Sequence, residues 1–241
     1  MIKLVQFPPY FGLPNASPFC LKMETYLRMV DLPYETVGIP DPRKAPKGKV
    51  PYIDDDGTLV ADSHFIVDHI ARKYGKRLDT HLTDEQRAAA HALRVMIEEH
   101  LYFATVYSRF VDDRNWPTSK REFFGGLPPI VRSLAPPLIR RQTVKQVYAQ
   151  GTGRHAAEEI YRGAGDDVRA LSVALGDKPF FTGDKPVELD AAAYGLLAQV
   201  FWTPSNPDLK AQCASLKNLE RFCERVRDRY FGAPGAAGAA G

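Results

Sequence analysis

The sequence predicts an α/β amino-terminal domain over residues 1–76 and an all-helical domain over 83–231. Short runs of β-branched and aromatic residues alternate with helical patterns before residue 76, and strand patterns are lacking after it. The 241 residues are 44% hydrophobic and 25% charged, so a substantial core can form. The low-complexity tail 232–241 is predicted to be flexible.

The first domain begins with a strand and ends with a helix. Ser17 is a good N-cap, Pro18 suits a first helical turn, and Asp55-Asp56-Gly57 predicts a hairpin. We predict strands over 2–7, 34–39, 50–53 and 58–61, and helices over 18–30 and 63–74. With a loop or short helix before the hairpin, this β-α-β-β-β-α order is the thioredoxin arrangement.

The second domain shows only helical patterns. Thr83 and Gln86 form a capping box at the start of a long helix. We predict helices over about 83–110, 138–149, 155–175, 187–201 and 207–230. The segment 125–137 is predicted to be loop-rich, and Trp116 to lie in a proline-flanked loop.

Composition narrows the classes of function. The net charge of +3 is below that of a dedicated nucleic-acid binder, and Arg140, Arg141 and Lys145 are interpreted as a solvated helix face. The apolar runs are too short for a signal peptide or a transmembrane helix. Three cysteines, an odd and low number, indicate a reducing compartment, so we expect a cytoplasmic protein.

Metal binding is not expected. The pairs His64/Asp68 and His155/Glu159 have helical i, i+4 spacing, but such pairs are usually ordinary surface contacts.

Ser17-Pro18-Phe19-Cys20 has the form of a C-P-[FY]-C redox motif in which serine replaces the first cysteine. The first position lies at a helix N-terminus, where N–H groups stabilise a thiolate. A hydroxyl there suits the binding of an external thiolate better than disulfide exchange. Alternatively, Ser17 serves only as an N-cap.

Val50-Pro51 begins a strand, although proline offers no ladder donor. A cis Val50–Pro51 bond is therefore expected, with the backbone of Val50 turned towards an extended peptide ligand. A plain edge-strand proline is the alternative.

Asp62-Ser63 directly precedes the helix that begins with His64. With Ser63 as N-cap, the helix N-terminus would bind a carboxylate, and Asp62 would bind an ammonium group. One γ-glutamyl group carries both charges. Ordinary capping is again the alternative.

Together these motifs resemble the glutathione S-transferase superfamily. The resemblance to its metaxin and failed-axon-connections branch lies in SPFCLKMETYLRM, KVPYI, ADSHFIVDHIA, GTGRHAAEEI and DKPFFTGDKPVELDAAAYG. Asp190 resembles the family's capping box, although Val187 replaces the usual serine or threonine.

The resemblance implies that glutathione is a co-substrate whose thiolate attacks a small apolar electrophile. It implies a thiol-activating hydroxyl on Ser17 or Tyr10, the latter in the long proline-rich loop. It further implies glutathione contacts at Lys49, Val50, Pro51, Asp62 and Ser63, and a second-substrate pocket at Tyr102, Phe103 and Tyr107. A homodimer is also implied.

Two other functions remain open. Metaxin-like proteins include non-catalytic adaptors, so the fold alone does not establish catalysis. A thiol-disulfide oxidoreductase that uses Cys20 is less favoured, because the first cysteine is missing. The identity of the electrophile does not follow from the sequence.

Overall fold

The computed structural model describes residues 1–10, 12–39 and 41–232, so most of the tail predicted to be flexible lies outside the described residues. The chain forms two compact units, each described here by itself. The first contains Met1–Arg94, Leu175–Ala198 and the residues from Asn218 onward, and the second contains Val95–Ala174 and Gln199–Lys217. This division follows spatial contacts, whereas the predicted boundary at 76–82 marks the change from strands to helices.

The first unit contains a four-stranded sheet with the order β2-β1-β3-β4. Its strands are β1 (Ile2–Gln6), β2 (Tyr34–Gly38), β3 (Tyr52–Asp55) and β4 (Thr58–Ala61). β1 and β2 are parallel, and the other neighbours are antiparallel. The predicted thioredoxin-like sheet is therefore confirmed.

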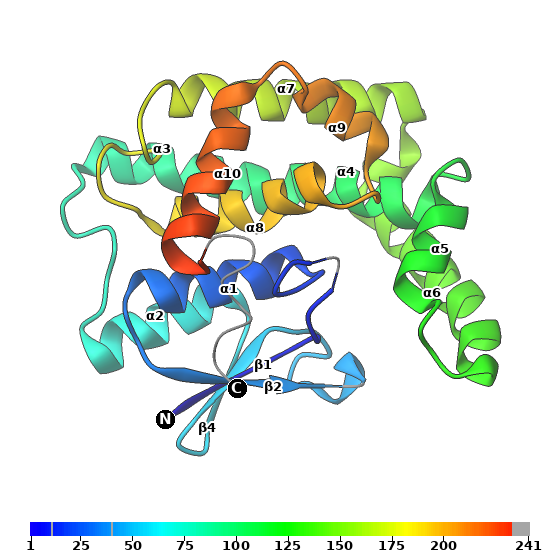
Figure 1. Ribbon diagram of the computed structural model, residues 1–241, viewed down its shortest axis with the longest axis horizontal. Coiled ribbons are helices and arrows are strands. Elements are labelled where there is room, and N and C mark those ends of the chain that lie inside the picture. The colour runs from blue at the N-terminus through cyan, green and yellow to red at the C-terminus, as the bar shows by residue number, and fades with distance from the viewer. Residues whose placement is uncertain (11, 40, 233–241) are drawn as a thin grey trace. The chain divides into compact units, whose positions relative to one another are not determined.

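Helices cover one face of this sheet (Figure 1). The first unit includes α1 (Pro18–Met29), η1 (Pro42–Lys44), α2 (Ser63–Tyr74), and most of α3 (Asp84–Val95), α8 (Glu188–Trp202) and α10 (Lys217–Tyr230). Its main core joins side chains from the sheet, α1, α2 and α8: Ile2, Leu4, Met23, Tyr26, Leu27, Val30, Ile53, Ile66, Val67, Ile70 and Ala191.

A buried carboxylate ties the β3–β4 hairpin to α2. Asp55 accepts hydrogen bonds from Tyr74 Oη at 2.7 Å and Lys73 Nζ at 2.8 Å, and its Oδ2 lies 2.6 Å from His69 Nε2. Burial opposes ionisation of Asp55, but these three partners lower its pKa to about 2. The β3–β4 hairpin is thus attached to α2 by ionic contacts, in addition to the backbone pairing between its own two strands.

The start of α8 is also fixed by a buried acid. Asp190 accepts the backbone N–H of Val187 at 2.8 Å and that of Phe181 at 2.9 Å. This is the half of a capping box in which the third helical residue reaches back to the N-cap. Val187 has no side-chain oxygen, so the reciprocal half is missing, as the sequence indicated.

The second unit consists of helices and π-helical turns. It contains η2 (Met96–Leu101), α4 (Tyr102–Val106), η3 (Tyr107–Val111), α5 (Trp116–Phe124), α6 (Pro129–Gln150), η4 (Thr152–Arg154), α7 (Ala157–Leu175) and α9 (Pro207–Cys213). The long helix predicted over 83–110 is present, with π-helical turns at η2 and η3 that the pattern did not predict. No helix among the described residues is long and apolar enough to cross a membrane.

Three local predictions were wrong. Trp116 begins helix α5 rather than lying in a loop, and the segment 207–230 contains two helices rather than one. The loop predicted over 125–137 is largely replaced by α6, which continues through Pro136 and Pro137. Proline usually breaks a helix. Here Pro136 is buried, and Arg140 in the next turn donates to Phe110 O at 3.0 Å, which anchors the helix.

Helices α1 and α8 approach closely at Gly195. A Cβ atom at this position would lie 2.5 Å from Pro18 O and 3.0 Å from Lys22 N, both backbone atoms of α1. Only a residue without a side chain fits this crossing. The contact holds the N-terminal turn of α1 against α8.

We predict that Gly195→Ala lowers the free energy of unfolding by about 1–3 kcal/mol, because the added methyl group collides with backbone atoms. Gly163→Ala in α7 is the matched control. Its Cβ would lie 3.5 Å from His100, an ordinary contact, so we expect a gain of about 0.5–1 kcal/mol from helix propensity. Denaturant unfolding measures both, and stabilisation by both substitutions would contradict the close approach.

Candidate functional site

Strand register brings three predicted binding segments to one end of the sheet. Val5 pairs with Tyr52, and Tyr52 pairs with Ala61, so these residues form one row across β1, β3 and β4. The loop to Ser17 leaves after β1, Val50-Pro51 comes before β3, and Asp62-Ser63 follows β4. Motifs up to 46 residues apart in sequence (17 to 63) therefore leave the sheet at the same end.

Ser17 is the N-cap of α1, as predicted. It is half-buried, and its Oγ accepts the N–H of Cys20 at 3.4 Å. A hydroxyl that accepts a hydrogen bond still has its own proton to donate. The capping role and a role towards a thiolate are therefore compatible.

Asn15 orients the backbone before Ser17, a role that the sequence analysis missed. Asn15 is buried; its Nδ2 donates to Phe7 O, and its Oδ1 accepts the N–H of Ser17 at 2.9 Å. An Asx residue two positions before a helix cap is the signal that would have identified it. Tyr10, the other candidate, lies in the same loop, where its backbone pairs with that of Leu13.

The Val50–Pro51 bond is cis, as predicted. Pro51 is buried and Val50 half-buried, while the neighbouring Lys49 is exposed. The ladders of β3 begin only at Tyr52, so Val50 lies beyond the paired residues. Its backbone therefore lies outside the sheet ladder, and its role towards an extended ligand stays a prediction.

Helix α2 spans the predicted residues 63–74, but its N-cap differs from the prediction by one residue. Asp62, not Ser63, is the N-cap, and its Oδ1 accepts the N–H of His64 at 3.0 Å. Asp62 has a φ of 86°, a conformation that L residues rarely adopt and that costs about 1–3 kcal/mol. Ser63 is the first helical residue, and its side chain is buried rather than at the exposed cap.

A buried ion pair lies beneath Ser63. Lys22, on α1, is only 1% exposed; its Nζ lies 2.7 Å from Glu188 Oε1 and 3.5 Å from Ser63 Oγ. Arg94 Nε lies 3.6 Å from the same Glu188 oxygen. Burial opposes ionisation of Glu188, but Lys22 and Arg94 lower its pKa below the ordinary value of 4.5.

This pair was not predicted, because its members are 166 positions apart. A lysine inside the apolar face of a helix was the only available signal. The pair connects α1, α2 and the start of α8 within the first unit.

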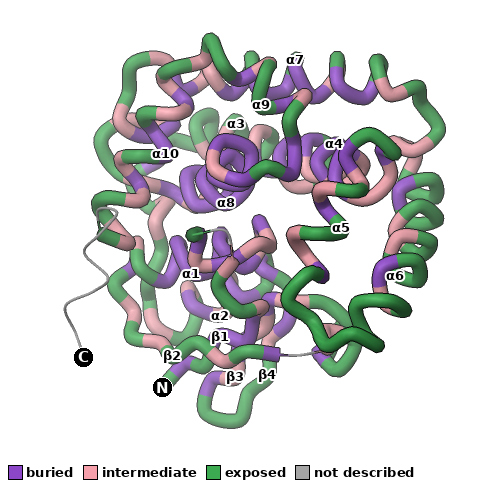
Figure 2. Tube along the Cα trace, turned by 45° about the vertical axis from the view of Figure 1, so that its right-hand side comes forward, coloured by how far each residue is buried: buried purple, intermediate pink, exposed green. Residues whose placement is uncertain are grey.

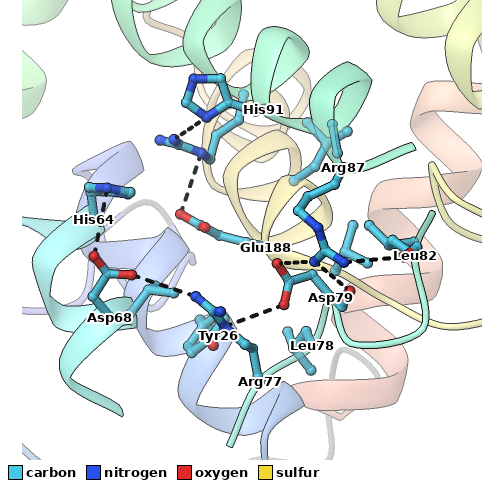
Figure 3. A pocket seen from close by; sticks show the side chains of 15 residues that line it. Tyr26, His64, Asp68, Arg77, Leu78, Asp79, Leu82, Arg87, His91 and Glu188 are labelled. Atoms are coloured by element: carbon cyan, nitrogen blue, oxygen red, sulfur yellow. Dashed lines mark hydrogen bonds and ion pairs between the residues drawn. The ribbon is translucent and has the colours of Figure 1, made fainter. Parts of the chain in front are cut away.

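Glu188 of this pair lines a hollow of about 200 Å³, and Figure 3 shows the side chains around it. Its charged lining residues form ion pairs with one another: Arg77 contacts Asp68 and Asp79, and Arg87 contacts Asp79 at 2.9 Å. Ligand pockets usually measure about 300–1,000 Å³. The hollow is smaller than that, and we interpret it as the route by which Glu188, 22% exposed, reaches solvent.

Cys20 is unsuited to thiol exchange. It is fully buried, and burial raises the pKa of its thiol to about 12 despite its hydrogen bond with Ser17. A thiol with so high a pKa is almost never ionised at neutral pH. This geometry argues against the oxidoreductase hypothesis.

The predicted second-substrate residues belong to the second unit. Tyr102 and Phe103 are half-buried on α4, and their rings meet edge to face at 5.3 Å between centroids. Tyr107, in the π-helical turn η3, contacts the ring of Tyr161 at 6.1 Å. Their role towards an electrophile stays a prediction. Among the described residues, no group of three or more His, Cys, Asp or Glu is arranged to hold a metal ion.

We predict that Glu188→Gln lowers the free energy of unfolding by about 3 kcal/mol at neutral pH, because Lys22 loses its carboxylate partner in a buried position. Because the pKa of Glu188 is lower in the folded protein, ionised Glu188 contributes its full stabilisation at pH values above its ordinary pKa of 4.5. This stabilisation is lost as the pH falls through the lower pKa of the folded state. The difference between the two proteins should therefore close below about pH 4.5.

Glu224→Gln, on the exposed face of α10, is the matched control and should change stability by less than about 0.5 kcal/mol. Denaturant unfolding at several pH values measures both variants. Equal stability of the two would show that the pair does not hold the first unit together.

Comparison with known proteins places this geometry in a family. A glutathione S-transferase N-terminal domain model matches residues 18–115, and a glutathione S-transferase C-terminal domain model matches 164–226. The chain is 34% identical to Failed axon connections of Drosophila melanogaster over 243 residues, covering 96% of this chain but 58% of that protein.

Two further relatives differ from each other in the activity that their names state and in how much of their length this chain covers. The chain is 33% identical to the isoprene-epoxide–glutathione S-transferase of Rhodococcus sp. (strain AD45) over 237 residues, covering 95% of this chain and 99% of that enzyme. It is 29% identical to human metaxin-1 over 237 residues, covering 94% of this chain and 50% of that protein.

Solved structures agree in fold. Glutathione transferase GSTFuA3 from Phanerochaete chrysosporium matches with a TM-score of 0.64 and 16% identity over 95% of this chain and 96% of that one. A Methylobacterium radiotolerans glutathione S-transferase in complex with glutathione sulfonate matches with a TM-score of 0.60 and 19% identity over 96% and 92%. With its sheet, its family-model matches and a relative of nearly the same length at 33% identity, the chain belongs to the glutathione S-transferase family.

Proposed function

We propose that this protein is a glutathione transferase that conjugates the glutathione thiolate to small apolar electrophiles. The observation that carries the proposal is the row Val5–Tyr52–Ala61, from which the Ser17 loop, Val50-Pro51 and Asp62-Ser63 all leave at one end of the sheet. The 33% identity to an isoprene-epoxide transferase, over 99% of that enzyme, supports it.

Each segment fits one part of glutathione. The N-terminus of α2, with Ser63 and Asp62, suits the charged γ-glutamyl end. The backbone of Val50 suits the peptide-like middle, and the N-terminus of α1 suits the sulfur. Lys49 directly precedes Val50 in the sequence and is exposed. Its flexible, positively charged side chain suits the glycyl carboxylate.

The activation of the thiol requires a specific donor. A free thiol has a pKa of about 8.5, and lowering it by two units requires about 2.7 kcal/mol of preferential stabilisation of the anion. A helix terminus contributes about 0.3–1 kcal/mol, whereas one hydrogen bond to a charged group contributes about 1.5–3. We assign the donor to the hydroxyl of Ser17, with Tyr10 as the alternative.

The non-catalytic adaptor remains the second candidate, since Failed axon connections and metaxin-1 are relatives whose names state no transferase activity. In that case the fold would present a partner surface and glutathione would bind weakly or not at all. Tyr102, Phe103 and Tyr107 as the electrophile pocket, and a homodimer, are further parts of the transferase proposal.

We predict that glutathione binds, and that Ser63→Ala weakens binding by about 1–2 kcal/mol because a contact to the γ-glutamyl carboxylate is lost. Isothermal calorimetry measures the affinity. Ser133→Ala, at an exposed position on α6, should bind like the wild type. Absence of binding at millimolar glutathione would overturn the enzyme proposal and favour the adaptor.

The second functional prediction concerns Ser17. Ser17→Ala should raise the pKa of the bound thiol by one to two units, because the thiolate loses a hydrogen-bond donor, at about 1.4 kcal/mol per unit. Conjugation near neutral pH should fall about tenfold and recover partly at higher pH, where the anion forms without help. Thiolate absorbance and the pH profile of conjugation are the measurements.

Two further variants separate the hydroxyl from the helix cap. Ser17→Gly retains most capping stability, with a cost of a few tenths of a kcal/mol, and should be as impaired as Ser17→Ala. Ser17→Thr should restore activity. Impairment of Tyr10→Phe with full activity of Ser17→Gly would instead assign the donor to Tyr10.

A further inference from the structure

Helix α6 exposes a continuous apolar stripe. Ile130, Leu134 and Leu138 are 75%, 62% and 66% exposed, and their spacing of four residues places them on one side of the helix. Val131 and Ile139 flank them and are also exposed. Figure 2 shows α6 exposed along most of its length. Large apolar side chains are seldom gathered this way on a surface that meets only water.

The same segment lacks negative charge. Residues 123–157 contain no Asp or Glu, although the 29 acidic residues in 241 would place about four there. Arg141 and Lys145 continue the outward face of α6 one and two turns beyond Leu138, and both are exposed. The face therefore combines aliphatic groups with a purely positive charge.

The fold of the second unit does not require this outward face. On the opposite side of α6, Pro136 and Val147 are buried, and Arg140 donates to Phe110 O and Val111 O and pairs with Asp113 at 2.6 Å. α6 also falls between the two segments matched by the family models, 18–115 and 164–226.

We infer that the outward face of α6 binds the surface of an anionic lipid bilayer, with the helix lying in the interface. In this orientation Ile130, Leu134 and Leu138 enter the boundary between headgroups and acyl chains, while Arg141 and Lys145 meet the lipid phosphates and carboxylates. Basic side chains with long apolar stems suit this depth because their charges reach the headgroups.

Charge and composition favour a bilayer over other occupants. A second copy that paired α6 with α6 would bury the aliphatic stripe but would give Arg141 and Lys145 no acidic partner, because the segment contains no acid. A nucleic acid would leave the leucine and isoleucine side chains without apolar contact, because its backbone recognition uses charge and its bases stack on aromatic rings.

The test is vesicle flotation of the full chain, with phosphatidylcholine vesicles and with phosphatidylcholine and phosphatidylserine at about three to one. We expect binding only to the anionic vesicles, weakened by salt. Leu134→Asp/Leu138→Asp should abolish binding. Arg141→Glu/Lys145→Glu should weaken it by more than about twentyfold, since each basic residue near the surface contributes about fivefold.

Matched controls distinguish a specific effect of the α6 face from the effects of apolar exposure elsewhere and of net charge. Val173→Asp, at a residue of α7 that is 83% exposed, tests apolar exposure elsewhere, and Lys76→Glu/Lys210→Glu tests the same change in net charge. The Val173 variant should bind like the wild type, and the charge control should weaken binding much less than the α6 pair. Circular dichroism and glutathione affinity should be unchanged in all four variants, because every altered side chain is exposed.

Several outcomes would overturn the inference. These are absence of binding at low salt, equal binding to neutral vesicles, retained binding by the Leu134/Leu138 variant, or equal losses in the α6 and control pairs. Self-association in sedimentation equilibrium that is lost in the Leu134/Leu138 variant, without vesicle binding, would assign the face to a second copy and reject the bilayer.

Discussion

The first unit depends on one buried ionic contact, between Lys22 and Glu188. Glu188 lies at the first turn of α8, and α8 begins where it does because Asp190 holds the N–H groups of Val187 and Phe181. Lys22 lies on the buried face of α1, and its Nζ also reaches Ser63. A buried pair of this kind often adds little net stability compared with apolar groups of the same size, but the loss of one partner is costly. The contact therefore specifies where α8 and α2 meet α1 more than it strengthens the fold.

That specification bears on the proposed chemistry. A helix N-terminus acts on a thiolate or carboxylate only within its first turn, so the placement of α1 and α2 must be accurate. Gly195 sets how closely α8 approaches α1, Asn15 sets the backbone that enters Ser17, and Asp55 fixes the hairpin that carries β4 to Asp62. The unusual φ of Asp62 then turns the chain into α2. Asp55 acts from the opposite end of the sheet and the other contacts lie nearer the proposed site, and together they fix the backbone from which it is built, which is the condition for preorganised binding.

The sequence predicted local features better than long-range ones. The strand order, the Ser17 cap and the cis Val50–Pro51 bond follow from patterns only a few residues long, and the structure contains them. The strand predicted over 50–53 instead spans Tyr52–Asp55, because the ladders begin only after Pro51. The misplaced cap at Ser63 arose because serine and aspartate are both good caps, and only the backbone turn at Asp62 decides between them. The Lys22–Glu188 pair could not be found because nothing near either residue indicates the other. Helix α6 was missed because proline was treated as a breaker, while burial of Pro136 and the tertiary contacts of Arg140 keep the helix intact.

The two proposals rest on different units and different forces, so neither requires the other. The proposed glutathione site uses backbone groups and a few oriented polar side chains of the first unit, which select one small ligand by geometry. The face of α6 in the second unit offers apolar area and positive charge without fixed partners, which suits a fluid surface rather than a single shape. One relative of this chain is named as a transferase, and two others have names that state no transferase activity. A fold in which the ligand site and an interaction face lie on separate elements can lose one while keeping the other, so the two proposals are tested separately.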